Sequence, residues 1–179
     1  MRRNILKTIS LLSMVWLMGA FGDLAAQSRR IKSMDDLFAV YEQEKGVGYI
    51  SISPSLLKLS FAADSKEMDD IFNCIASLRI LNMDITPELE RLANRIRLDV
   101  LNLVRQENFE EIMKMREGDS DFAIYLSKSK DKTSKQLEAL LLVANGKDEL
   151  VLIGISGKIT KAVIDAVMEG KIGIMPKKK

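Results

Sequence analysis

The sequence predicts a single α+β domain in which helices pack on a largely antiparallel β-sheet of about five or six strands. Up to about residue 106, stretches with apolar residues at helical spacing alternate with short extended stretches. From residue 109 onward the pattern has period two, near residues 109–116, 121–127, 136–144 and 149–156. Asn145-Gly146 separates the last two stretches and favours a tight hairpin, because a type I′ turn needs positive φ at both central residues. We therefore expect the last two strands to pair.

The first half of the domain is expected to alternate between helices and strands. Ser33 is typical of a capped helix start, and this helix should end at Lys45-Gly46. Residues 47–53 have the β-branched and aromatic content of a strand. Pro54 should end that strand, because proline cannot donate to a β-ladder. Ser53-Pro54 also has the pattern of an N-cap followed by proline at the first helical position, so a brief helix should follow directly.

Two further helices and one strand complete this half. Apolar residues at helical spacing predict a helix around residues 68–75, and residues 78–83 are expected to be extended. Thr86-Pro87 then opens the longest helix. Its apolar face consists of Leu89, Leu92, Ala93, Ile96, Val100, Leu103 and Val104. This helix should be the main one packed on the sheet. Near the end of the chain, Thr160 is expected to cap a final helix.

Residues 140–143 and 150–155 are apolar on both faces of their predicted strands. Such strands are either central strands covered on both sides or part of a surface that a partner buries. Both explanations are open at the level of sequence. The residues of a partner-binding surface here would be Leu140, Leu142, Val151, Ile153 and Ile155.

Residues 1–26 have the features of a secretory signal peptide, with a positive start, an apolar run over residues 9–21 and a cleavage site near Ala26-Gln27. The positive start is made by Arg2, Arg3 and Lys7. The run is short for a membrane span. The single cysteine, Cys74, lies far downstream, so lipid attachment is not expected. We expect an exported, periplasmic protein without a stable membrane anchor after cleavage.

The mature chain is expected to contain a short N-terminal segment (27–32), one domain (33–170) and a basic C-terminal tail (171–179). Loss of the signal peptide lowers Lys plus Arg from 27 to 24 and Asp plus Glu from 25 to 24, because Arg2, Arg3, Lys7 and Asp23 leave. The mature chain is then formally neutral. Nucleic-acid binding, which needs a strongly basic face, is not indicated.

The chain has no histidine, which excludes Ser-His and Cys-His nucleophiles and His-ligated zinc. Three local patterns are similar to functional motifs, and for each a structural role is favoured. Ser55 and Lys58 have the S-x-x-K spacing of penicillin-recognising enzymes, with Lys132-Thr133-Ser134 as a weak second element, but a helix start is favoured. Asp119-Ser120-Asp121 lacks the rest of an EF-hand and favours a solvated turn. Residues 154–157 favour close backbone packing or a strand exit over a dinucleotide loop.

Four segments of the chain have a distinctive order and spacing. They are Phe38-Ala39-Val40-Tyr41, residues 46–59 (GVGYISISPSLLKL), residues 77–83 (SLRILNM) and residues 138–160, which contain ELVLIGISGKIT. Together they resemble the Bacteroidota envelope proteins grouped as domain of unknown function 4252, over roughly residues 33–168. The resemblance implies an α+β fold with helices against a largely antiparallel sheet, and it implies no activity or catalytic residues. Some members look like lipoproteins, whereas this chain lacks the required cysteine.

These observations favour a non-enzymatic protein-interaction module of the cell envelope, with an envelope protein as its partner and with the oligomeric state left open. No catalytic residue, cofactor or metal is assigned, and Cys74 is expected to be a small buried hydrophobe. The alternative is a carrier that holds a lipid or peptide between sheet and helices, which a concentrated apolar pocket would favour. A histidine-independent hydrolase is the third hypothesis, and it requires buried carboxylates that converge in a cleft.

Overall fold

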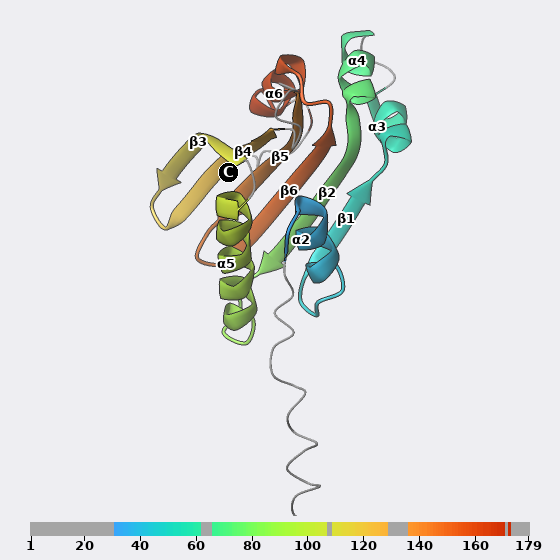
Figure 1. The fold of residues 1–179 in the computed structure, drawn as a ribbon. Helices are drawn as coiled ribbons and strands as arrows, with labels where there is room; N and C mark the ends of the chain where they lie inside the picture. The colour runs from blue at the N-terminus through green and yellow to red at the C-terminus, as the bar shows by residue number, and fades with distance from the viewer. Residues whose placement is uncertain (1–30, 62–65, 107–108, 129–135, 171, 173–179) are drawn as a thin grey trace, which may run out of the picture. The chain divides into compact units, whose positions relative to one another are not determined.

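The computed structural model describes residues 31–61, 66–106, 109–128, 136–170 and 172. These residues form one six-stranded antiparallel sheet with helices on both faces (Figure 1). The strands are β1 (Gly48–Ile52), β2 (Ile75–Asp84), β3 (Phe109–Glu117), β4 (Ser120–Lys128), β5 (Leu137–Asn145) and β6 (Glu149–Gly157). The helices are α2 (Met34–Tyr41), α3 (Pro54–Phe61), α4 (Lys66–Cys74), α5 (Glu90–Gln106) and α6 (Lys161–Met168). The predicted α+β class and the antiparallel sheet are confirmed.

The strand order is β1-β2-β6-β5-β4-β3. Strands β3 to β6 form a meander of consecutive hairpins, and β2 joins the free side of β6. The β2–β6 register, in which Ile80 lies opposite Ile153, brings together two parts of the chain that are far apart in sequence. Helix α5 connects β2 to β3, which are separated by the other three strands of the meander.

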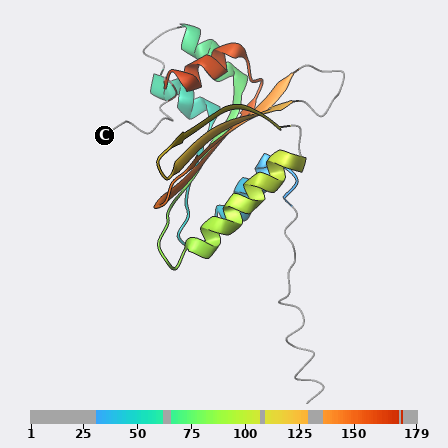
Figure 2. The ribbon, with the colours of Figure 1, turned by 90° about the vertical axis from the view of Figure 1, so that its left-hand side faces the viewer.

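Helices α2 and α5 cover the first face of the sheet (Figure 2). Ser33 caps α2 as predicted, since its hydroxyl accepts a hydrogen bond from the Asp36 amide at 3.1 Å. Both helices contribute fully buried side chains, among them Phe38 and Leu103. Each such side chain stabilises the fold by about 1.5–3 kcal/mol. Ile31, which precedes the predicted domain start, also packs into this layer.

Helices α3, α4 and α6 cover the second face, and they gather at one end of it (Figures 1 and 2). The α3 start at Pro54 and the Thr160 cap of α6 are confirmed, the latter by a hydrogen bond from the Val163 amide to Thr160 Oγ1 at 3.4 Å. Ile172, just beyond the predicted domain end, is buried in the same layer. The opposite end of the second face has no helix above it among the described residues.

The structure corrects the predicted boundary between α4 and β2. Ile75 was expected on the apolar stripe of the helix, but α4 ends at Cys74 and Ile75 is the first residue of β2. The sheet imposes this boundary, because Ile75 lies opposite Gly157 of β6 and the Cys74 carbonyl accepts a hydrogen bond from the Lys158 amide at 2.8 Å. Pairing with a central strand outweighs the local helical pattern. Cys74 itself is half-buried.

The β5–β6 hairpin is confirmed, but its turn differs from the predicted one. The amide of Gly146 donates to the carbonyl of Glu149 at 2.8 Å, so Lys147 and Asp148 are the central residues of the turn. Asn145 belongs to β5, and Gly146 does not have positive φ. Gly146 is close to Ser120, where an added Cβ would lie 3.3 Å from the hydroxyl oxygen. The glycine therefore serves close packing against the neighbouring hairpin.

Candidate functional site

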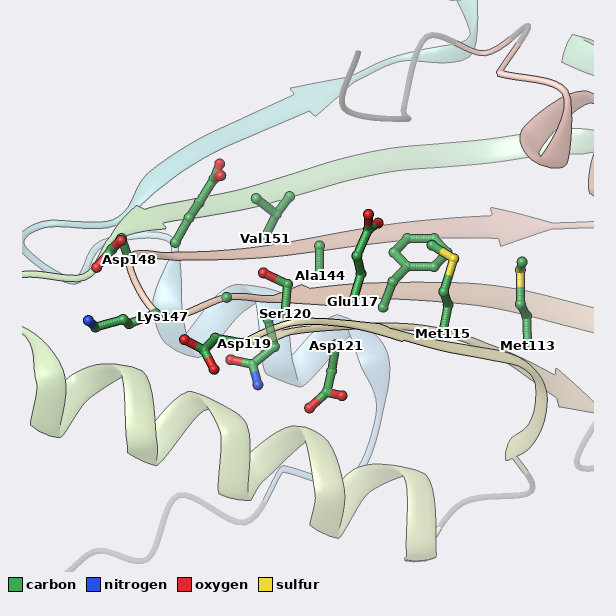
Figure 3. Close-up of a pocket in the computed structure, with 14 residues that line it drawn as sticks. Met113, Met115, Glu117, Asp119, Ser120, Asp121, Ala144, Lys147, Asp148 and Val151 are labelled. Carbon is green, nitrogen blue, oxygen red and sulfur yellow. The ribbon is translucent and has the colours of Figure 1, made fainter. Parts of the chain in front are cut away.

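An open groove of about 630 Å³ lies at the uncovered end of the second face (Figure 3). Its floor is a row of four apolar side chains that lie directly opposite one another on four adjacent strands. They are Met115 of β3, Phe122 of β4, Ala144 of β5 and Val151 of β6. Alternate residues of a strand point to the same face, so this row belongs to the same surface as the core beneath α3, α4 and α6. The groove is thus a continuation of the core into solvent.

Burial changes stepwise along this face. The row beneath the helices includes Leu140 and Ile155, which are both fully buried. The middle row runs Ile50–Ile80–Ile153–Leu142–Ile124–Met113 across all six strands and is buried only in its centre. In the groove row, Phe122, Ala144 and Val151 are half-buried, while Met115 is 49% exposed. The exposed apolar surface results from helices that cover only part of the sheet.

The next row toward the hairpin turns is acidic. Glu117 of β3 lies opposite Ser120 of β4. On the next strand, Gly146 is close enough to Ser120 that an added Cβ would contact it, and Gly146 closes the β5–β6 turn with Glu149. Glu149 in turn lies opposite Asp84 of β2. Three carboxylates therefore follow the apolar row on the same face, and Asp119 and Asp148 in the turns add to them. Among the described residues, Lys147 is the one basic residue that lines the groove.

Asp121 is the only carboxylate of the groove lining that has an ion-pair partner within the described part of the chain. Arg116 Nε contacts Asp121 Oδ1 at 2.6 Å. The hydrogen bond from Arg116 and its positive charge lower the pKa of Asp121, and the same contact raises the pKa of Arg116. Arg116 and Asp121 lie two residues from Lys114 and Ala123 along their strands, so their side chains point to the same face as Ala123, which is the first face of the sheet. Among the described residues, no basic side chain forms an ion pair with Glu117 or Glu149 on the groove face.

Arg97 of α5 holds the turn that forms one wall of the groove. Its Nε donates to Asn145 Oδ1 at 2.6 Å, and its Nη2 donates to the Gly146 carbonyl at 3.1 Å. From the β2 side, the Ile85 amide donates to the Asp148 carbonyl at 2.8 Å. The turn is therefore fixed from both sides, which holds Glu149 and Val151 in place on the other face of the sheet.

A second, smaller cavity of about 240 Å³ lies on the first face between α5 and strands β3 to β6. Arg97 and Leu101 of α5 line it, together with Lys114 and Tyr125 of the sheet. Burial raises the pKa of Tyr125, and the negative charge of Glu111 raises it further. The cavity has charges of both signs and is less than half the volume of the groove.

The structure separates the five residues of the predicted partner-binding surface. Leu140, Leu142, Ile153 and Ile155 lie in the core, where the helices of this chain cover them. These four residues are therefore apolar because a second layer of helices from this chain covers them, and not because a partner does. Val151 is the exception, since it is half-buried and lines the groove.

Met113, Met115 and Phe122 were not predicted from the sequence as site residues. The available signal was the alternation in residues 113–116, where methionines on one face alternate with Lys114 and Arg116 on the other. An edge strand with one apolar and one charged face indicates a surface that is at least partly covered. The second signal was the acidic segment 117–121, which was interpreted as a solvated turn.

The remaining local patterns do not form a reactive cluster. Ser55 is an exposed residue of the first turn of α3, and Lys132-Thr133-Ser134 lies outside the described residues. No three acidic or cysteine side chains of the described residues are placed to hold a metal ion. Gly154 shows the close packing expected for it, because an added Cβ would lie 2.6 Å from a ring carbon of Phe38. The predicted signal peptide, most of the predicted N-terminal segment and all of the tail except Ile172 also lie outside the described residues.

The family described as a domain of unknown function (DUF4252) matches residues 41–167. The chain belongs to this family. The match spans all six strands and every residue that lines the groove, so the groove is part of the DUF4252 domain. No curated protein and no solved structure matches the chain. Within the described part of this DUF4252 protein, no helix has the length and hydropathy needed to cross a bilayer.

Proposed function

We propose that this DUF4252 protein is a non-enzymatic interaction module of the bacterial cell envelope, which binds a protein partner through the groove on the second face of its sheet. Export to the periplasm through the signal peptide of residues 1–26, and a host among the Bacteroidota, are part of this proposal. The main support for it is the row Met115–Phe122–Ala144–Val151, an apolar surface that the described helices leave open.

The size and chemistry of this surface support a contact role. Apolar side chains on a rigid sheet lose little conformational freedom when a partner covers them, so their burial contributes directly to binding. Phe122 and the two methionines are residue types that are enriched in protein interfaces. Four of the carboxylates are exposed at strand ends and turns, so they lack the burial that is typical of a catalytic acid or base; they are Glu117, Asp119, Asp148 and Glu149.

A small-ligand carrier is the second candidate, and one observation favours it. The groove volume of about 630 Å³ lies in the range of pockets for small molecules. Core side chains fill the layer between the sheet and helices α3, α4 and α6, and the cavity between α5 and the sheet, at about 240 Å³, is below the usual size of a small-molecule pocket. A lipid or peptide would have to lie in the open groove instead.

Site-specific photo-crosslinking in the native host tests the proposal. A benzophenone amino acid replaces Met115 in the groove, and in a matched control it replaces Leu98 on α5, which is exposed on the other side of the sheet. We expect the Met115 variant to form one defined adduct with an envelope protein, and the Leu98 variant to form none. If neither position captures a protein while the protein is exported and folded, the interaction module is rejected. Native mass spectrometry of the purified protein then tests the small-ligand carrier.

A further inference from the structure

We propose that the occupant of the groove is a basic amphipathic segment of the partner, with apolar side chains on the floor and lysines or arginines against the acidic row. This inference rests on the proposed function and specifies the chemistry of the partner. It follows from the order of two rows on one face of the sheet, the apolar row Met115–Phe122–Ala144–Val151 and the acidic row that contains Glu117, Glu149 and Asp84.

The apolar row sets the length of the bound segment. It crosses four strands, which are separated by three interstrand spacings of about 4.8 Å, so it is roughly 14 Å long. A helix of about nine residues or an extended segment of about four residues covers that distance. The row is bounded on one side by the helix-covered core, so the segment has to lie across the strands at the free end of the sheet (Figure 3).

The acidic row sets the charge of the segment. Consecutive residues on the same face of a strand are about 7 Å apart, so Glu117 lies about one such step beyond Met115, and Glu149 lies one step beyond Val151. Figure 3 shows Glu117 on the same side of the sheet as Met115. A lysine or arginine side chain can span this step while its stem stays on the apolar floor.

Charge complementarity also decides against other occupants. Of the described residues that line the groove, five are acidic and one, Lys147, is basic. Asp121 points to the first face and pairs with Arg116, which leaves four acidic side chains at the groove without an ion pair among the described residues. The described residues contain no ion pair for Glu117, Asp119, Asp148 or Glu149. An anionic membrane surface, a nucleic acid or an acidic peptide would be repelled by these charges. An uncharged apolar ligand would leave the acidic row unused.

Binding of designed peptides to the purified full-length protein, as processed by its host, tests the inference. The probe is a fluorescent peptide of about twelve residues that alternates leucine with lysine, and its twin has glutamate in place of lysine. Fluorescence anisotropy gives the affinity of each. We expect the lysine peptide to bind at least about tenfold more tightly than its twin, and to weaken as salt rises from about 50 mM to about 300 mM.

Charge-reversed variants locate the binding site. The double variant Glu117→Lys with Glu149→Lys should weaken binding of the lysine peptide at least about tenfold and strengthen binding of the glutamate peptide. The matched control, Asp70→Lys with Glu138→Lys, changes the net charge equally at exposed positions outside the groove and should leave both affinities nearly unchanged. Equal effects of the two double variants would show that the peptide responds to net charge alone, and would overturn the inference.

The photo-crosslinking experiment separates failure of the inference from failure of the proposed function. Mass spectrometry of the Met115 adduct identifies the partner segment in contact with the groove. A segment with apolar residues and clustered lysines or arginines supports the inference. A captured segment that lacks basic residues, including one from a second copy of this chain, overturns the inference and leaves a protein-binding groove. Absence of any adduct overturns the proposed function itself.

Discussion

The phenolic hydroxyl of Tyr41, at the end of α2, donates a hydrogen bond to the carboxylate of Asp99, in the middle of α5. This contact ties together the two helices that cover the first face of the sheet, and it is made by a tyrosine that is otherwise fully buried. Burial raises the pKa of Tyr41, and the hydrogen bond to Asp99 raises it further. The stability of this helical layer therefore depends on the protonation of Tyr41.

Removal of the Tyr41 hydroxyl should destabilise the fold in a pH-dependent manner. Because the pKa of Tyr41 is higher in the folded than in the unfolded state, its stabilising contribution is complete below the ordinary tyrosine pKa of about 10 and is lost as the pH rises above it. We expect Tyr41→Phe to cost about 1–2 kcal/mol at pH 7 and progressively less as the pH rises above about 10. Urea unfolding of both proteins measures this difference, and the Tyr125 contribution cancels because it is common to both. An equal cost at all pH values would contradict the prediction.

Loss of the Arg97 guanidinium should loosen the β5–β6 turn. Arg97→Gln removes the paired hydrogen bonds to Asn145 and to the Gly146 carbonyl, and we expect a loss of about 1–2 kcal/mol in the free energy of unfolding. Amide hydrogen exchange should accelerate at Gly146 and Ile85, whose bonds close the turn. Arg91→Gln, at an exposed position of the same helix, is the control and should change neither quantity. Unchanged exchange at Gly146 in the Arg97 variant would show that the turn is fixed by other contacts.

A side chain at Gly157 should strongly destabilise the fold. Gly157 has a φ of 139°, and an added Cβ would lie 2.2 Å from the Cys74 carbonyl oxygen, at the junction of α4 and β2. We expect Gly157→Ala to cost at least about 3 kcal/mol. Gly118→Asn is the matched control, because Gly118 has a φ of 59° that asparagine tolerates and no neighbour within 4 Å of its Cβ position. Thermal unfolding of both variants should show a large decrease only for Gly157→Ala.

Because the helices cover only one end of the second face, truncations in the covered row and in the groove row should lower the free energy of unfolding by different amounts. Leu140 is fully buried under the helices, so Leu140→Ala should lower the free energy of unfolding by about 2–5 kcal/mol. Val151 is half-buried in the groove row, so Val151→Ala should cost about 1 kcal/mol or less. Chemical denaturation gives both values. Similar costs would indicate that the groove row is as well packed as the core.

Local sequence patterns predicted most of the helices and strands, but they did not predict which side chains form the exposed groove. The helix starts at Ser33, Pro54 and Thr160 follow from capping chemistry, which acts within a few residues, and all three are confirmed. The boundary at Ile75 and the turn after Asn145 were predicted differently, because each involves a contact with a residue far away in the sequence, Gly157 in one case and Ser120 in the other.

The groove could not be predicted for a related reason. Leu140 and Val151 have the same apolar character and the same alternation, yet one is covered and the other is not. The difference depends on how far α3, α4 and α6 extend along the sheet, which is set by the packing of whole helices. No periodicity within a strand contains that information.

The pairing of β2 with β6 has a consequence for the order of folding. Hairpins β3–β4, β4–β5 and β5–β6 join neighbours in sequence and close short loops, whereas β2–β6 closes a loop that contains α5 and strands β3 to β5. Local pairing is kinetically favoured, so we expect the meander to gain protection from hydrogen exchange before Ile80 does in a pulse-labelling experiment. The last step of folding then adds β1 and β2, with the helices between them, to a sheet edge that β6 already presents.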